Sequence, residues 1–300
     1  MAQSAQFTQI DRDLLQETLQ KKLSDLPPLP AVVNRIILTV NDPSTTAEDL
    51  NRLISMDQAL AAKILRIVNS SYYGFPRRVS TVTHAVVILG FNTVRNLVMG
   101  ISAFGALAQG SEYGVKRYEF WRHAVATAVA ASVTAKRKLP KARSVIEEVF
   151  IAGLLHDMGL LYLDTQLPVQ YAILLGEAQR ASISIEEAEQ AILGMDHMQI
   201  GQSIAEHWNF PASLATAIGQ HSRPDPQSEY FRSAAVIHCA DWVAWQIGAG
   251  ISCLVHNSRM SKPVYDWLGF SEQDFDWLIR DIQAKFSGAE EMVGSLAAAA

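Results

Sequence analysis

The chain has 300 residues, 49% of them hydrophobic, and its 25 basic and 30 acidic residues give a net charge of −5. This length and composition predict one large domain or two lobes with a sizeable core. The mild acidic balance and the lack of a long basic run argue against a nucleic-acid-binding surface. The densest basic cluster, Lys136-Arg137-Lys138, is expected to lie in a solvated loop.

The cysteine content and the apolar segments indicate in which cellular compartment the protein is expected. Cys239 and Cys253 lie 14 positions apart, so the chain has neither a disulfide framework nor a CxxC motif. The first residues lack the basic and apolar regions of a signal peptide. Every strongly apolar stretch is interrupted by His, Asp or Gly before the roughly 18 residues that a membrane span requires. We therefore expect a cytoplasmic protein without a membrane segment.

Apolar residues recur with helical periodicity along the chain, whereas alternating strand patterns are scarce, which predicts an all-α fold. Thr46 with Asp49 resembles a capping box, and Ser184 with Glu187 forms the more usual version of that pattern. Thr46 and Asp57 are expected to cap two successive helices. Further helices are predicted over residues 8–23, 31–40, 81–89, 92–107, 119–135, 145–156, 169–180, 185–193, 197–208, 211–221, 228–246 and 271–286.

A polar, glycine-containing segment, Gln109–Gly114, is the best candidate for an internal boundary. It predicts an N-terminal helical lobe over residues 1–110 and a second helical lobe over residues 111–290 that includes the C-terminal helix. Aromatic residues at 267, 275 and 277 indicate that this last helix docks on the protein. Residues 251–264 have no clear periodicity.

The pair His156-Asp157 follows an apolar helix that is expected to be buried. Burying a carboxylate costs several kcal/mol unless it is paired or bound to a metal. The alternative is that Asp157 only caps a helix while His156 packs in the core. A cation at Asp157 would require further ligands, and the other histidines and acids are the candidates.

Eight histidines are present, and five of them fall between residues 123 and 221, close to helix ends or on largely apolar helices. Imidazole and carboxylate ligands together suit Fe, Mn, Ni or Zn, while the absence of a thiolate cluster argues against a softer site. His84, His207 and His256 are expected to be structural, and His238 is expected to orient Asp241.

These residues and several N-terminal motifs carry a family resemblance. His123, the pair His156-Asp157 and the distant Asp241 resemble the HD superfamily of metal-dependent phosphohydrolases. Between about residues 23 and 241 the chain also resembles the HDOD family, the HD-related output domain of bacteria, through the segments Leu26–Pro30, Asp57–Leu65, Val68–Ser70 and Ala85–Gly90. This resemblance implies an all-α fold in which a helical lobe packs on an HD-like lobe. It also implies a role in signal transduction, in a family whose catalysis is generally not established.

The resemblance further implies a metal site of six residues. One ion would be held by His123, His156, Asp157 and Asp241. His197 and His221 look like the additional ligands of the HD-GYP phosphodiesterases, in which case Asp157 would bridge to a second ion. Glu119, one helical turn before His123, would help to hold the metal or orient the histidine, or else pair with Arg122 at the surface. Two ions would clamp a phosphate and activate a bound water.

Two departures from the related phosphodiesterases weaken the case for catalysis. Leu160 stands where those enzymes carry a lysine, and their Gly-Tyr-Pro motif is absent, with Ser222–Asp225 in that region. No phosphate-binding glycine loop and no serine nucleophile elbow are present. The favoured interpretation is a regulatory protein that acts through contacts with other signalling proteins, with one or two bound transition-metal ions. The alternatives are an active phosphohydrolase or cyclic dinucleotide phosphodiesterase, and a metal-free scaffold.

Overall fold

The computed structural model describes residues 7–40, 42, 44–70, 72–107, 114–255 and 259–297. Within these ranges the chain forms sixteen α-helices and no β-strand, which confirms the predicted all-α class. No helix in the described part of the chain is long and apolar enough to cross a membrane. The helices are α1 (Gln9–Ser24), α2 (Ala31–Val40), α3 (Ala47–Ile54), α4 (Gln58–Val68), α5 (Val82–Leu89), α6 (Phe91–Leu107), α7 (Arg117–Lys138), α8 (Arg143–Leu155), α9 (Met158–Gln166), α10 (Pro168–Ala181), α11 (Ile185–Leu193), α12 (His197–His207), α13 (Ala212–Gly219), α14 (Phe231–Gln246), α15 (Lys262–Leu268) and α16 (Glu272–Ala297).

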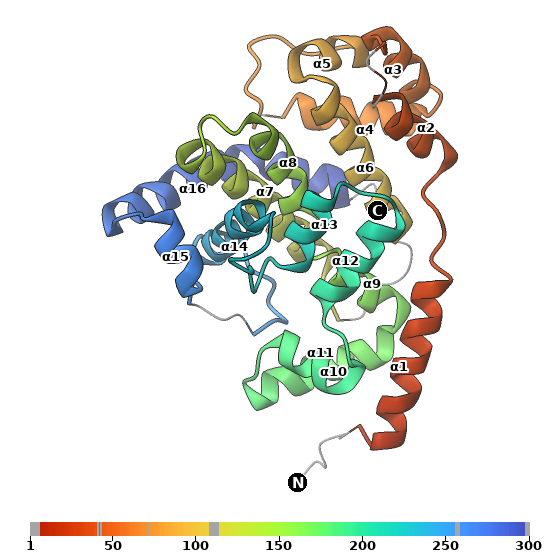
Figure 1. The fold of residues 1–300 in the computed structure, drawn as a ribbon, viewed down its shortest axis with the longest axis vertical. Helices are drawn as coiled ribbons and strands as arrows, with labels where there is room; N and C mark the ends of the chain where they lie inside the picture. Colours follow the sequence, from red (N-terminus) through yellow and green to blue (C-terminus); the bar gives the residue numbers. More distant parts are fainter. Residues whose placement is uncertain are drawn as a thin grey trace.

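The helices are arranged around α7, with α2–α5 gathered at one end of the molecule (Figure 1). Helix α1 stands apart from its neighbours in sequence and lies along α11, where Gln16 Nε2 donates to the carbonyl of Ile192. Helix α6 packs against both α8 and α9. The core is therefore continuous from the N-terminal helices to those that carry the histidines.

Helix α7 is buried along nearly its whole length, because its middle is made of small and β-branched residues. Helices α8, α14 and α16 pack directly on it. The closest approach is at Gly153 of α8, where an added Cβ would lie only 2.7 Å from the Cα of Ala128. This tight packing brings His123 of α7, His156 after α8 and Asp241 of α14 to the same end of the bundle.

Local capping follows the predicted chemistry. Thr46 and Asp49 form a reciprocal capping box at α3, and the side chain of Asp57 accepts from the N–H of Leu60 at the start of α4. At α11 the hydroxyl of Ser184 accepts from the N–H of Glu187. Gly90 adopts a positive φ of 87° and separates α5 from α6, as expected for a glycine break.

Three expectations are corrected. The basic cluster at residues 136–138 is the last turn of α7 and not a loop, and Arg137 there pairs with Asp274 and stacks over Trp277. The chain forms α9 directly after Asp157, where a helix end alone was predicted. The last helix continues to residue 297, because Met292 and Val293 are buried within the fold.

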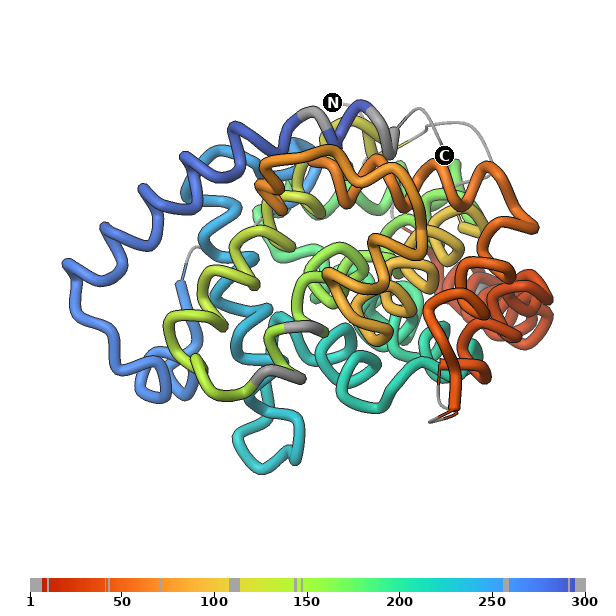
Figure 2. Tube along the Cα trace, turned by 90° about the horizontal axis from the view of Figure 1, so that it is seen from above, coloured from red at the N-terminus to blue at the C-terminus, as the bar shows by residue number. Residues whose placement is uncertain are grey.

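The docking of the C-terminal helix is confirmed. Helix α16 runs along one side of the molecule in Figure 2 and contacts both α7 and α4. The aromatic side chains of Tyr72, Tyr73 and Phe75 also pack against the core, where Tyr72 stacks on Phe150 at 4.6 Å between ring centroids. The predicted boundary near residue 110 falls on residues 108–113, outside the described part of the chain, so the division into two lobes stays a prediction.

Candidate metal centre

Four histidines surround the side chain of Asp157, and they divide between its two oxygens. Oδ2 lies 3.5 Å from Nε2 of His123 and 3.2 Å from Nε2 of His156. Oδ1 lies 3.7 Å from Nε2 of His197 and 3.5 Å from Nε2 of His221. The structure thus brings together two sets of three ligand atoms, each able to hold a metal ion, with Asp157 common to both.

Asp241, the sixth predicted residue, joins one of these sets. Its Oδ1 lies 3.1 Å from Nε2 of His123. We call the group of His123, His156, Asp157 and Asp241 the first subsite. The second subsite comprises Asp157, His197 and His221.

Helix ends position most of these side chains. Asp157 occupies the N-cap position of α9 but makes no side-chain capping bond, so its carboxylate is free to face the histidines. His156 directly precedes it, at the end of α8. Asp196 caps α12 and thereby places His197 at the first helical position. His221 follows the end of α13 and bonds the carbonyl of Ile218 in its last turn.

All four imidazoles turn Nε2 toward Asp157, because each Nδ1 is engaged elsewhere. Nδ1 of His123 lies 3.1 Å from the carbonyl oxygen of Ala249. His156 and His221 bond the carbonyls of Gly153 and Ile218, both at 2.8 Å. A carbonyl can only accept, so each of these rings carries its proton on Nδ1 and presents a lone pair on Nε2.

This tautomer pattern tests whether a cation fits the site. The Nε2 atoms of His123 and His156 face each other at 3.2 Å. Two lone pairs at that distance repel unless a proton or a metal ion lies between them. Oδ1 of Asp241 is buried and has no hydrogen-bond donor. Fe, Mn, Ni and Zn coordinate nitrogen and oxygen atoms with free lone pairs. Here such atoms are buried without hydrogen-bond partners, so the residues fit a transition metal.

Burial and neighbouring charges oppose each other here. Burial lowers the pKa of His197, but the carboxylates of Glu189, Asp157 and Glu186 together outweigh burial and raise that pKa to about 10. Burial and the adjacent His156 lower the pKa of His221 to about 4. Burial raises the pKa of Asp157, yet His156, His123 and His221 together outweigh burial and hold that pKa well below the ordinary value. Asp157 is therefore ionised at neutral pH, as a metal ligand must be.

Glu189 was not among the predicted residues. It is fully buried on α11, and its Oε2 lies 2.7 Å from Nδ1 of His197. The available signal was its spacing, because Glu189 lies four residues after Ile185 and four before Leu193 and so shares their buried face. A carboxylate on such a face needs a partner.

The remaining candidates lie outside the centre. Glu119 accepts hydrogen bonds from the backbone and hydroxyl of Ser252 and pairs with Lys116, so it fastens a loop at the surface and does not face the ligands. His238 bonds the carbonyl of His221 through Nδ1 and accepts from the N–H of Ser261, so it supports the backbone of a ligand and not Asp241. His84 and His207 are exposed, and His256 lies outside the described residues.

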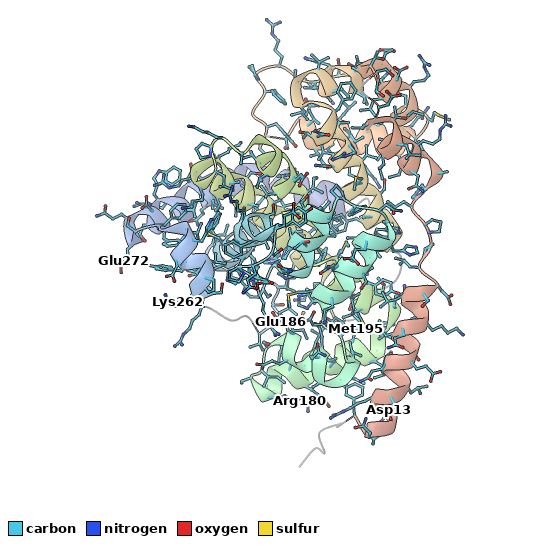
Figure 3. All side chains as sticks on the ribbon, viewed as in Figure 1. Asp13, Arg180, Glu186, Met195, Lys262 and Glu272 are labelled. Atoms are coloured by element: carbon cyan, nitrogen blue, oxygen red, sulfur yellow. The ribbon has the colours of Figure 1, made fainter. Side chains whose placement is uncertain are left out.

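Two adjoining cavities reach the centre. A small one of about 30 Å³ is lined by five of the six predicted ligands, His123, Asp157, His197, His221 and Asp241, together with neighbours that include Glu186 and Trp245. A larger one of about 830 Å³ shares Glu186, Ser222 and Asp241 with it, and Arg223 and Arg259 are also among its lining residues. Glu186 is labelled in Figure 3, on the side of the molecule where α11 begins. Leu160 is fully buried in the core and lines neither cavity.

Comparisons with known proteins agree with this fold. The family model described as HDOD domain matches residues 26–224. An HDOD domain protein with unknown function from Geobacter sulfurreducens superposes with a TM-score of 0.74 at 22% identity, over 95% of this chain and 98% of that chain. At that identity the likeness shows the fold alone.

Two further solved structures are 25% identical to this chain. A candidate signal transduction protein from Marinobacter aquaeolei VT8 superposes with a TM-score of 0.72. The match covers 96% of this chain and 68% of that chain. A candidate phosphohydrolase from Shewanella amazonensis SB2B has a TM-score of 0.71, with coverage of 94% and 98%.

A relative of known sequence is an uncharacterized protein of Treponema pallidum (strain Nichols). It is 28% identical over 218 residues, which are 72% of this chain and 41% of that protein. The chain therefore spans less than half the length of this relative.

Proposed function

The chain belongs to the HDOD family, and from this we propose that it is a cytoplasmic regulatory protein of signal transduction that binds metal at the HD-like centre. The observation that carries the proposal is the convergence of four histidine Nε2 atoms and the carboxylates of Asp157 and Asp241 in two adjoining groups. We propose His123, His156, Asp157 and Asp241 as ligands of one ion, and Asp157, His197 and His221 as ligands of a second.

The regulatory part of the proposal concerns what the metal does. An ion held by these residues would tie α7, α8, α12, α13 and α14 together, so its binding would be coupled to the packing of the second lobe. We propose that the lobes comprise residues 1–110 and 111–290, and that the protein acts by contacting other signalling proteins. The 25% identical relative named for signal transduction supports this role.

A second candidate function is metal-dependent phosphoester hydrolysis. The large cavity favours it, because it would let a substrate reach the centre from Ser222 and Asp241. The name of the Shewanella protein points the same way. Bound metal would activate a water and stabilise charge on a phosphate. Leu160 opposes this function, because it supplies no cation, and the only lysine or arginine side chains lining either cavity within the described residues are those of Arg223 and Arg259.

Elemental analysis tests the metal binding that both functions share, and an activity panel separates the two functions. The protein is purified without chelator, and its metal content is compared with that of a His156→Ala, Asp157→Ala double variant. We expect one to two equivalents of a transition metal in the wild type and a loss of both in the variant. Less than about a tenth of an equivalent in the wild type would contradict metal binding. The same samples are tested on a panel of phosphomonoesters, phosphodiesters and cyclic dinucleotides, and turnover that Asp157→Ala abolishes would replace the regulatory function with the hydrolytic one.

A further inference from the structure

The partner of His197 distinguishes it from the other three histidines of the centre. Both its ring Nδ1, at 2.7 Å, and its backbone N–H, at 2.8 Å, contact Oε2 of Glu189. The second oxygen of Glu189 accepts a 2.6 Å hydrogen bond from the hydroxyl of Tyr171. Glu189 and Tyr171 are both at most 1% exposed, so this chain of contacts is shielded from solvent.

The Glu189 contact orients the imidazole ring of His197 and also changes the donor strength of its Nε2. A carbonyl partner, as at His123, His156 and His221, fixes the tautomer and leaves the donor strength of Nε2 close to that of a neutral imidazole. A carboxylate on Nδ1 also pushes electron density onto the ring and makes Nε2 a stronger donor. The effect is largest where water is excluded, because an ionic contact is screened least there.

The two subsites differ in their own negative charge. The first subsite has the carboxylate of Asp241 in addition to one oxygen of Asp157. The second has only the other oxygen of Asp157, with two imidazoles. A divalent ion there would lie among ligands that compensate less of its charge. Glu189, which contacts the second subsite only at the far side of the His197 ring, is placed to supply the missing charge through that ring.

We propose that Glu189 is a positioning and charge-supplying residue for the second subsite alone, and that Tyr171 holds its carboxylate in place. This inference rests on the proposed metal binding and extends it, because it assigns unequal affinities to the two ions and names the residue responsible. Glu189 does not ligate metal itself, since the oxygen nearest the centre is engaged by Nδ1 and the backbone of His197.

Glu189→Gln isolates the charge, because glutamine has nearly the same shape and its oxygen still accepts from His197. Tyr171→Phe removes only the hydroxyl that orients Glu189. Glu187→Gln is the matched control, since Glu187 is an exposed acid of the same helix. Each variant of the full chain is stripped of metal and titrated with Zn²⁺ in competition with a chromogenic chelator, and again with Co²⁺ to record the visible spectrum of each bound ion.

We expect the wild type and Glu187→Gln to bind two ions. In Glu189→Gln the first ion is unchanged and the second is weakened about 10–100-fold, the usual effect of losing such a partner. Tyr171→Phe weakens the same ion by a smaller factor, and in both variants only the Co²⁺ spectrum of the second ion shifts. Circular dichroism identifies a variant that has failed to fold, and Tyr171→Phe then decides alone.

Equal affinity for the second ion in wild type and Glu189→Gln overturns the inference, as does equal weakening of both ions in a folded variant. A wild type that binds one ion overturns it while leaving the proposed metal binding intact. A wild type that binds none overturns both.

Discussion

The carbonyl oxygen of His197 lies where a side chain on Gly159 would have to be: a Cβ built on Gly159 would come within 1.9 Å of that oxygen. Glycine at this position thus lets α9 and α12 approach closely enough for both subsites to share Asp157. Gly201 lies on the other side of the same contact, with its backbone nitrogen 3.1 Å from the position that this Cβ would occupy.

Gly159→Ala is therefore expected to separate α9 from α12. The obstructing atom belongs to the backbone, so it cannot rotate away. We therefore expect the free energy of unfolding to fall by about 1–3 kcal/mol. The second subsite should lose its ion, since His197 moves relative to Asp157. Urea denaturation and elemental analysis measure the two effects.

Gly176→Ala is the matched control for this prediction. Gly176 lies within α10, where an added Cβ meets nothing within 4 Å. Alanine has the higher helix propensity, so this variant should gain up to about 1 kcal/mol and keep its metal. If both variants are equally stable and equally loaded, the close packing of α9 on α12 is not what Gly159 provides.

Substitutions at Asp157, Asp241 and His221 are expected to leave no ion, one ion and one ion, respectively, with a different ion remaining in each of the last two. Asp157→Asn should lose both ions, because its two oxygens face different subsites. Asp241→Asn should weaken only the first ion, and His221→Ala only the second. Metal content per protein, measured after gel filtration, checks all three. Identical losses in the three variants would mean that a single ion is held by all the residues together.

How far the sequence predicts this centre depends on the kind of residue. The convergence of the six candidate ligands could be predicted, because histidine and aspartate at the ends of apolar helices need partners and the family resemblance groups them. Glu189 could not be assigned in this way, since a buried acid on α11 identifies no partner until the fold brings His197 to it. Supporting residues are specified by tertiary contacts, and their spacing in the sequence carries little information about them.

Helix α9 was missed for a related reason. Gly159, after His156-Asp157, is typical of a helix end, and the chain does end α8 there. The chain nevertheless turns at the pair and begins a new helix at once. The glycine is required by the approach of α12 and not by a helix stop. Sequence alone does not distinguish these two uses of glycine, because both exploit the missing side chain.

Removing the metal is expected to destabilise the protein. Without a cation, the facing Nε2 atoms of His123 and His156 must take up a proton to avoid repulsion. Free metal at about 100 times its dissociation constant stabilises the fold by about 2.7 kcal/mol. For a chain of this size that corresponds to roughly 5–10 °C in Tm. Thermal unfolding followed by circular dichroism, with and without chelator, measures the shift.

The His156→Ala, Asp157→Ala double variant serves as the control for chelation. Its Tm should be the same with and without chelator, since it has no complete subsite. A shift of equal size in wild type and variant would show that the chelator acts elsewhere on the protein.

Asp164 tests a buried charge that lies away from the metal centre. Its side chain is fully buried on α9, where Oδ1 accepts from the N–H groups of Gly114 and Val115 and Oδ2 lies 3.5 Å from Arg117. It therefore fixes the entry of the chain into α7, the helix that carries His123. Asp164→Ala removes the ion pair with Arg117 and leaves two buried N–H groups without their acceptor, so it should cost about 3–5 kcal/mol.

The exposed pair Lys262–Asp266 is the comparison for Asp164, because both members are more than half exposed. Asp266→Ala should cost no more than about 0.5 kcal/mol, since water screens such a pair. Urea denaturation of the two variants should therefore differ by several-fold in the free energy lost. Folded Asp164→Ala should still bind metal, because the ligands keep their own partners, and only its stability should fall. If the folded variant instead loses metal, then Asp164 also positions His123 through α7 and supports the first subsite.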